Sequence, residues 1–208
     1  MVKVKVCGIT NLADAEKALE LGADALGFNF YPPSPRCIAP ETARGILEKL
    51  PQSHVNVAVV VNEPKQRVEN IIARASANGG GSGLNWLQFH GDEGPDYCRG
   101  WKVTVIKAFR LKDRISVPHL EGFPADFYLL DSWSPGYGGS GEAFPLEWVE
   151  NIDPAKLILS GGLNPENVGA AILRIRPFGV DVCSGVERVP GIKDYEKLKK
   201  FIDAAKNA

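Results

Sequence analysis

The sequence predicts an α/β fold, a minimal (β/α)8 barrel of about the smallest size known for that fold. The chain contains eight short runs rich in β-branched and aromatic residues, and helix-like stretches separate most of them. No GxGxxG motif follows the first run, which makes an open doubly wound sheet the weaker of two alternatives. The length of 208 residues lies close to the lower limit of about 200 residues for a (β/α)8 barrel.

The predicted elements alternate along the chain. The strands span residues 2–6, 23–28, 55–61, 84–89, 103–109, 126–131, 156–160 and 178–182. The helices span residues 11–21, 41–50, 65–75, 146–152, 166–175 and 194–205. Several helices begin next to a proline, which the first helical turn tolerates because its N–H groups have no helical partner. The stretches after the fourth and fifth strands, 93–101 and 111–123, carry only weak helical signals.

One segment differs in composition from the rest of the chain. The stretch ANGGGSGLN (77–85) is rich in Gly and Ser, as flexible linkers are. It lies between the third predicted helix and the fourth predicted strand, on the rim of the barrel opposite the usual active-site face. We therefore expect a flexible, functionally silent loop within a single domain of residues 1–208.

The composition excludes several classes of protein. The formal net charge of −1 gives no electrostatic footprint for binding to nucleic acid or to a membrane surface. No apolar run approaches the roughly 20 residues that span a bilayer, and the N-terminus does not resemble a signal peptide. The four cysteines form no CxxC pair, which argues against a zinc site and a disulfide framework. The expected location is the cytoplasm.

In a (β/α)8 barrel the active site lies at the carboxyl ends of the strands and in the loops that follow. Three consecutive loops of this kind, 136–141, 160–163 and 183–187, are rich in glycine. Glycine lets successive backbone N–H groups approach an anion closely, although each glycine could instead only form a tight turn. Three such loops on one rim favour a phosphate site.

Cys7 and Asp131 are the candidates for acid–base chemistry at this rim. Because the eighth strand of a closed barrel pairs with the first, both residues face the same mouth, with the glycine loops between them. A sugar phosphate held there could place one carbon near the thiol and one oxygen near the carboxyl group. The alternatives are that Cys7 is a small buried hydrophobe and that Asp131 is a helix cap or a loop salt bridge.

The first strand, VKVKVC, alternates between two faces. If Cys7 faces the interior, so do Lys3 and Lys5, while the valines pack outward against helices. Buried lysines are rare unless paired, and Asp181 on the eighth strand is the expected partner for these lysines. Two roles remain open for Lys5: it favours the thiolate of Cys7, or it only fills and neutralises the barrel interior.

Six blocks that run from one end of the chain to the other carry a family resemblance. They are VKVCGIT (4–10), GADALGFNFYPPSPR (22–36), LQFHGDE (87–93), LLDS with GGSG (129–141), SGGLNPENV (160–168) and DVCSGVE with PGIKD (181–194). As a set they resemble the phosphoribosylanthranilate isomerase family, (β/α)8 enzymes of tryptophan biosynthesis. The resemblance implies an isomerase that catalyses the Amadori rearrangement of N-(5-phosphoribosyl)anthranilate to 1-(2-carboxyphenylamino)-1-deoxyribulose 5-phosphate, with no cofactor and no metal.

The resemblance also implies roles for individual residues. Cys7 is the general base and Asp131 the general acid, and Arg36 pairs with the anthranilate carboxylate, an anion that suits a guanidinium fork. The residues that match the phosphate loops are Gly139, Ser140, Gly141, Gly161, Gly162, Ser184 and Gly185. The residues that could support the site are Lys5, Gln88, His90 and Asp181. The expected partner is a phosphorylated small molecule, and the expected assembly is a monomer or a homodimer.

The sequence departs from the family pattern at three places. Ser140 stands where the family often has threonine, which keeps the hydroxyl group, and Cys183 stands where it usually has serine. The GGGSG insertion adds length on the opposite rim. The alternatives to the isomerase are another phosphosugar enzyme on the same fold, such as indoleglycerol-phosphate synthase or the aldose isomerase of histidine biosynthesis, and a catalytically silent phosphate-binding barrel. The histidine-pathway enzyme would use two aspartates, whereas this chain has Cys7 on its first strand.

Overall fold

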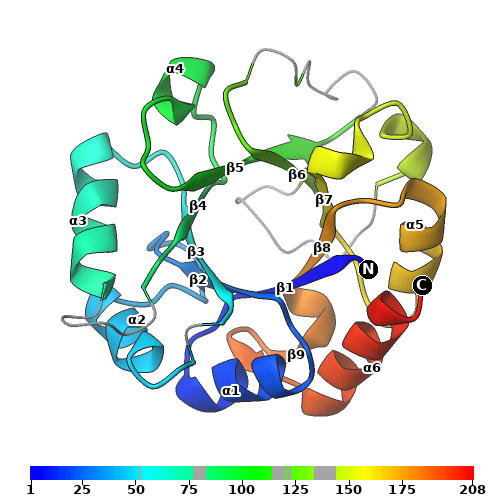
Figure 1. The fold of residues 1–208 in the computed structure, drawn as a ribbon, viewed down its shortest axis with the longest axis horizontal. Coiled ribbons are helices and arrows are strands. Elements are labelled where there is room, and N and C mark those ends of the chain that lie inside the picture. The colour runs from blue at the N-terminus through cyan, green and yellow to red at the C-terminus, as the bar shows by residue number, and fades with distance from the viewer. Residues whose placement is uncertain (52, 77–82, 114–119, 121–122, 134–143) are drawn as a thin grey trace.

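Eight parallel strands close into a barrel, with β8 hydrogen-bonded to β1. The structure is a computed structural model and describes residues 1–51, 53–76, 83–113, 120, 123–133 and 144–208. The strands are β1 (Lys3–Cys7), β2 (Ala25–Asn29), β3 (Val55–Val60), β4 (Trp86–Phe89), β5 (Thr104–Leu111), β6 (Phe127–Ser132), β7 (Leu157–Leu159) and β8 (Gly179–Val182). They form the central ring in Figure 1, with the helices outside it. The predicted (β/α)8 barrel is confirmed.

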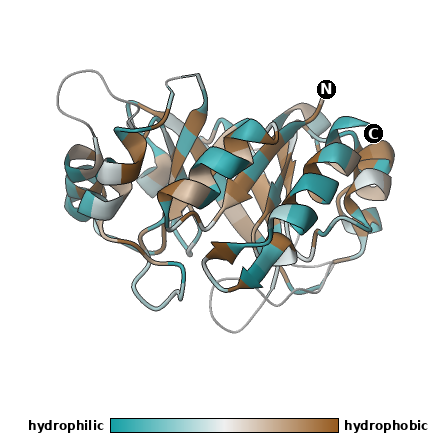
Figure 2. Cartoon of the chain, turned by 90° about the horizontal axis from the view of Figure 1, so that it is seen from below, coloured by the Kyte–Doolittle hydropathy of each residue, from teal (hydrophilic) through white to brown (hydrophobic). Residues whose placement is uncertain are grey.

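The helices pack around this ring with one apolar face inward. They are α1 (Leu12–Glu20), α2 (Pro40–Leu47), α3 (Lys65–Ala75), α4 (Pro95–Cys98), α5 (Val168–Ile175) and α6 (Tyr195–Lys206). Side-chain caps fix two of the starts, since Asn11 accepts from the backbone N–H of Asp14 and Asp194 accepts from those of Glu196 and Lys197. Figure 2 shows hydrophobic residues on the central strands and hydrophilic stretches along the surrounding helices.

Two parts of the chain differ from the prediction. Where a helix was expected over residues 146–152, the 3-10 helix η3 (Leu146–Trp148) forms instead, and a second 3-10 helix, η4 (Pro154–Lys156), follows the predicted segment. A segment of seven residues gains little from helix propensity alone, and Pro154 disfavours helical backbone at the residue before it, so the segment cannot be extended into a longer helix. After β8, the short helix η5 (Ser184–Val186) leads into an unpredicted antiparallel hairpin, β9 (Glu187–Val189) and β10 (Ile192–Lys193). Its turn contains Gly191 at φ +84°, a conformation that glycine adopts readily.

The alternation predicted for the first strand is present. Val4 and Val6 are fully buried in the core between barrel and helices. Lys5 is buried inside the barrel, whereas Lys3 lies at its N-terminal end, where Nζ pairs with Oδ1 of Asp24 at 3.0 Å. The residues that pack together in the barrel interior are Val57, Val59, Ile106, Ala108, Leu129 and Ile158, with Cys7 against them.

The Gly/Ser-rich stretch lies between α3 and β4, as predicted. Residues 77–82 of this stretch fall outside the described residues, so its expected flexibility stays a prediction. At its described end, Asn85 accepts a hydrogen bond from the backbone N–H of Asn56 through its side-chain oxygen, at 2.8 Å. The next residue, Trp86, begins β4.

Candidate active site

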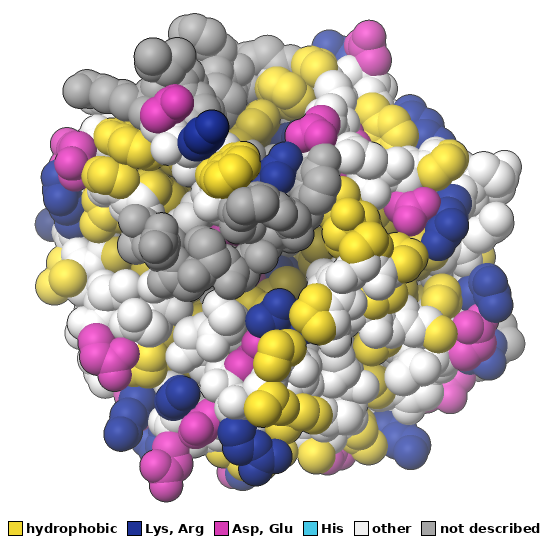
Figure 3. Space-filling model, turned by 180° about the vertical axis from the view of Figure 1, so that it is seen from behind, with side chains coloured by type: hydrophobic (Ala, Val, Ile, Leu, Met, Phe, Trp, Pro, Cys, Tyr) yellow, Lys and Arg dark blue, Asp and Glu magenta, His cyan; other side chains and the backbone are white. Residues whose placement is uncertain are grey.

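A cavity of about 130 Å³ opens at the carboxyl end of the barrel. Figure 3 views this face, where acidic and basic side chains lie at the edge of a central hollow. The predicted site residues that line the cavity are Cys7, Arg36, Gln88, His90, Asp131, Gly161, Gly162, Asp181, Ser184 and Gly185. Lys5 lies one layer below. Gly139, Ser140 and Gly141 fall outside the described residues, so their phosphate-binding role stays a prediction.

Cys7 ends β1, and its sulfur lies in space left by Gly27 on β2. A Cβ atom at position 27 would come within 2.8 Å of Cys7 Sγ and 3.1 Å of Lys5 Nζ. The neighbouring Cys183 side chain, and after it the charge of Lys5, outweigh burial and lower the pKa of Cys7 to about 6. The thiolate is therefore the main form of Cys7 at neutral pH, and the thiolate is the form that accepts a proton.

Lys5 forms the buried ion pair that the first strand predicts. Its Nζ lies 2.6 Å from Oδ1 of Asp181, and both side chains are 5% exposed. Ser160 holds the other oxygen of Asp181, since its hydroxyl donates to Oδ2 at 3.1 Å. Burial alone would lower the pKa of Lys5, but Asp181 and Cys7 raise it above its ordinary value. Lys5 thus remains an ammonium group and both fills the interior and favours the Cys7 thiolate.

Replacing Lys5 by methionine is expected to lower the free energy of unfolding by about 3–5 kcal/mol, because Asp181 would keep a buried and unpaired charge. Urea denaturation measures this loss. Lys3→Met is the matched control, because Lys3 Nζ pairs with Asp24 at 3.0 Å but its side chain is 56% exposed, and exposed pairs contribute less than about 1 kcal/mol. Equal losses in the two variants would contradict a special role for the buried pair.

Asp131 lies across the cavity at the end of β6, beside His90 after β4. His90 Nε2 is 3.2 Å from Oδ2 of Asp131, within ion-pair distance but not aligned as a hydrogen bond. The other ring nitrogen, Nδ1, is 2.7 Å from Nε2 of Gln88. When the Gln88 amide donates to Nδ1, the proton of a neutral imidazole sits on Nε2 and faces the carboxyl group. In this tautomer the Nε2–H group of His90 can stabilise a carboxylate at Asp131.

Arg36 reaches the cavity from the loop after β2 and is held by Glu187 of the hairpin. Glu187 accepts hydrogen bonds from Nε at 3.0 Å and from Nη2 at 2.6 Å. Lys193 Nζ in turn donates to Glu187 at 3.0 Å and to the backbone carbonyl of Cys7 at 2.6 Å. Because Glu187 occupies one edge of the guanidinium, the Nη1–Nη2 edge is the one placed to bind a carboxylate, and the described residues make no hydrogen bond with Nη1.

The glycine loops after β7 and β8 approach neighbouring atoms more closely than any side chain would allow. Gly161 and Gly162 adopt φ +76° and +65°. A Cβ atom at Gly161 would come within 2.4 Å of the Ser132 backbone nitrogen, and one at Gly185 within 2.1 Å of the Leu163 carbonyl oxygen. These positions require glycine, and the two loops pack directly on each other at the rim.

Sequence reasoning missed three residues that hold the site together. Gly8 follows Cys7 at φ +75°, and a Cβ atom there would lie 2.8 Å from both Cys183 Sγ and Arg36 Cδ. Glu187 and Lys193 join the hairpin to Arg36 and Cys7. The Pro190–Gly191 pair is a turn signal that could have indicated the hairpin, but the sequence carries no signal for the partners of these charges.

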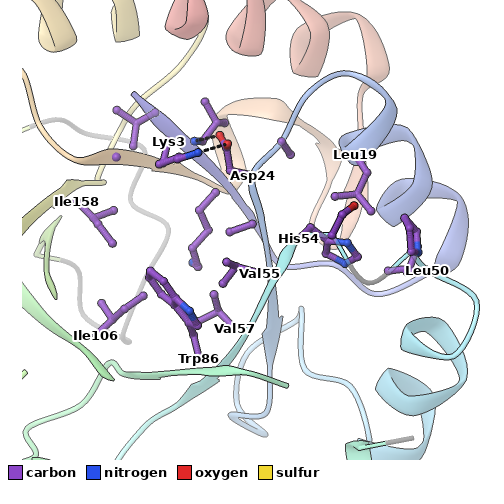
Figure 4. A pocket seen from close by; sticks show the side chains of 18 of the residues that line it. Lys3, Leu19, Asp24, Leu50, His54, Val55, Val57, Trp86, Ile106 and Ile158 are labelled. Atoms are coloured by element: carbon purple, nitrogen blue, oxygen red, sulfur yellow. Dashed lines mark hydrogen bonds and ion pairs between the residues drawn. The ribbon is translucent and has the colours of Figure 1, made fainter. Parts of the chain in front are cut away.

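A larger cavity, of about 650 Å³, lies at the opposite end of the barrel. Figure 4 shows it bordered by apolar side chains such as Trp86, Ile106 and Ile158, with Lys3 and Asp24 paired to each other at its edge. Trp86 and Phe127 stack at 4.9 Å between ring centroids and close the interior from this side. The acid–base candidates all lie at the other end, so the smaller cavity is the candidate active site.

The mouth of the barrel holds a thiol with a low pKa, a carboxyl–imidazole pair and a guanidinium group around glycine loops. These features define the class: a (β/α)8-barrel enzyme for proton transfer on an anionic small molecule. The family model described as N-(5'phosphoribosyl)anthranilate (PRA) isomerase matches residues 4–204. The chain belongs to this family, and it is an isomerase of tryptophan biosynthesis.

Individual relatives agree over the whole length. N-(5'-phosphoribosyl)anthranilate isomerase of Desulforudis audaxviator is 46% identical over 213 residues, which cover 100% of both chains. The crystal structure of the Thermotoga maritima isomerase has a TM-score of 0.88 and 43% identity, with 100% of both chains covered. A further isomerase, in complex with reduced 1-(o-carboxyphenylamino)-1-deoxyribulose 5-phosphate, has a TM-score of 0.85 and 40% identity, also with 100% of both chains covered.

None of the helices in the described ranges combines the length and the apolar character needed to cross a membrane. Among the same residues, no three His, Cys, Asp or Glu side chains come together in a way that could hold a metal ion.

Proposed function

We propose that this chain rearranges N-(5-phosphoribosyl)anthranilate with Cys7 as general base and Asp131 as general acid. The observation that carries the proposal is that both residues line one cavity, with a Cys7 pKa lowered to about 6 and His90 beside Asp131. The base is thus ready to accept a proton at neutral pH, while the carboxyl group has a neighbour that can stabilise its carboxylate form once its proton has been donated.

The first step opens the sugar ring. Asp131 donates its proton to the ring oxygen as the C–O bond breaks, and the anthranilate nitrogen supplies the electron pair that forms the Schiff base. Asp131 becomes a carboxylate, which His90 Nε2 at 3.2 Å stabilises. The bond between Asp131 Oδ1 and the Ser132 backbone N–H, at 2.8 Å, keeps the carboxyl group oriented throughout.

The second step removes a proton from the sugar carbon next to the Schiff base. The Cys7 thiolate accepts this proton, the electron pair moves into the C–N system, and an enolamine forms. Tautomerisation of the enolamine gives the ketone product. Asp181, 2.6 Å from Lys5 Nζ, neutralises the charge of this ammonium group. Lys5 therefore stabilises the thiolate but does not attract the anionic groups of the substrate.

Three groups of residues bind the anionic ends of the substrate. Arg36 binds the anthranilate carboxylate through its Nη1–Nη2 edge. The loops after β7 and β8 bind the phosphate with backbone N–H groups, and Ser184 adds a hydroxyl group. Gly139, Ser140 and Gly141 belong to the same phosphate site in this proposal, which needs no metal or cofactor. The chain acts in the cytoplasm as a single-domain monomer or homodimer.

A turnover assay tests the proposal. The purified protein should consume freshly made N-(5-phosphoribosyl)anthranilate, followed by the loss of substrate fluorescence. A Cys7→Ala, Asp131→Asn double variant under the same conditions measures the spontaneous decay of the substrate. If the parent protein is no faster than this double variant, the isomerase function is rejected.

Replacing Arg36 by lysine is expected to raise KM by about 10- to 100-fold, because a bidentate charged contact contributes about 1.5–3 kcal/mol to binding. The change in kcat should be smaller, since the carboxylate takes no part in the bond changes. Steady-state kinetics separate the two constants. The half-buried Arg44 on α2, which lies 3.8 Å from Glu48, gives the control variant Arg44→Lys. An unchanged KM in Arg36→Lys would assign the carboxylate to another residue.

A further inference from the structure

We propose that Cys183 is a positioning residue of the isomerase reaction, whose thiol donates a hydrogen bond to the Cys7 thiolate and holds that thiolate in the barrel mouth. The proposal rests on the general-base role proposed above for Cys7. It gives a function to a side chain that stands where the family usually has serine and that the sequence alone leaves without a role.

The strand register brings the two cysteines side by side. β1 and β8 are parallel neighbours, and Lys5 lies opposite Asp181 while Val6 lies opposite Val182. The next residues along the two strands are Cys7 and Cys183. Because side chains alternate along a strand, both turn to the same face as the Lys5–Asp181 pair, which is the barrel interior. Both line the cavity at the mouth, and each side chain acts on the pKa of the other.

The surroundings decide which sulfur keeps the proton. Lys5 places its positive charge next to the Cys7 sulfur, since a Cβ atom at Gly27 would lie within 2.8 Å of Cys7 Sγ and 3.1 Å of Lys5 Nζ. The neighbouring Cys7 side chain and, after it, burial raise the pKa of Cys183 well above its ordinary value. Cys183 therefore stays a thiol and has one S–H group to donate.

That single S–H group has two acceptors within reach. One is the Cys7 thiolate, and the other is Oε1 of Glu187 at 3.7 Å. The same oxygen of Glu187 already accepts from Arg36 Nε at 3.0 Å, from Lys193 Nζ at 3.0 Å and from the Gly191 backbone N–H at 3.2 Å. A carboxylate oxygen with three donors gains little from a fourth and weaker one, so the thiolate is the better acceptor.

Cys7 has further charged neighbours on each element that packs against it. The groups that act on its charge are Lys5 on β1, Asp181 on β8, Cys183 directly after β8, Lys193 on β10 and Arg36 in the loop after β2. Asp131 and His90 line the same cavity from the opposite side. A change at Cys183 leaves all the other groups in place, so it isolates the effect of one S–H donor on the thiolate.

Two variants of the full chain test the proposal. Cys183→Ala removes the donor, and Cys183→Ser restores one as a hydroxyl group. The alkylation rate of Cys7 by iodoacetamide is measured against pH, with the Cys7 peptide quantified by mass spectrometry, and kcat/KM is measured over the same range. In Cys183→Ala, the midpoint of the alkylation curve and the acidic limb of the kcat/KM profile should both move up by about one pH unit. At pH values below this limb, kcat/KM should therefore be about tenfold lower than in the parent. At alkaline pH the rate should return to that of the parent, and Cys183→Ser should follow the parent throughout.

The outcomes separate this proposal from the one on which it rests. An unchanged alkylation midpoint in Cys183→Ala overturns the role of Cys183. An equal fall in kcat/KM at every pH, with both limbs in place, also overturns it, because that result indicates lost packing only. Cys183→Val fills the space without a donor and provides the same test if the alanine variant does not fold. A Cys7→Ala variant with parental turnover instead removes Cys7 from the chemistry, even where the alkylation midpoint still moves.

Discussion

Replacing Cys7 by alanine is expected to lower kcat/KM by about 10²- to 10⁴-fold, the usual contribution of one general base. The Cys7 sulfur is the proton acceptor that Lys5 and Cys183 prepare, and alanine has no atom in its place. The fluorescence assay measures the loss. Cys7→Ser should be about as inactive, because a serine hydroxyl group at neutral pH is not ionised and is a poor base.

A second thiol in the chain provides the matched control for this loss. Cys98 is 2% exposed and lies in α4, outside the barrel, where burial raises its pKa. Cys98→Ala removes the same number of atoms, and its kcat/KM should remain close to that of the parent. If Cys7→Ala kept most of its activity, another group would have to remove the proton, and the mechanism proposed for the second step would be wrong.

The barrel could be predicted from sequence because its signals are local. Each strand is a short run such as residues 55–61, and each helix shows one apolar face, so a simple alternation fixes the fold class. The helix predicted over residues 146–152 is wrong, because the segment is short and Pro154 prevents its extension, and the 3-10 helix η3 forms there instead. Local sequence signals thus predict the strands and helices of the barrel, but not the conformation of a short connection between two of them.

The site was predicted less completely, because its electrostatics depend on the register between strands that are far apart in the chain. Lys5 and Asp181 could be paired in advance, since closure of the barrel makes β1 and β8 neighbours. The bidentate contact of Arg36 with Glu187 could not, because it requires the hairpin after β8 to fold back over the mouth. The same fold-back places Lys193 against the carbonyl of Cys7, at 2.6 Å.

Replacing Asp131 by asparagine is expected to lower kcat/KM by about 10²- to 10⁴-fold, the usual contribution of one general acid. The side-chain oxygen of asparagine can still accept from the Ser132 backbone N–H, which Asp131 bonds at 2.8 Å, so the site should keep its shape. An amide has no acidic proton for the ring oxygen. Asp126→Asn, just before the other end of β6, is the matched control, because among the described residues Asp126 Oδ2 accepts only from the Val105 backbone N–H, at 2.8 Å.

A substrate with deuterium on the sugar carbon that loses its proton distinguishes the two roles. In Asp131→Asn, ring opening becomes the slow step and precedes C–H cleavage, so the isotope effect on the rate should become small. In Cys7→Ala, proton removal becomes the slow step, and the isotope effect should reach its full size. The opposite pattern would exchange the roles of the two residues. Because both variants keep the binding groups in place, the difference between them reports which bond each residue helps to break.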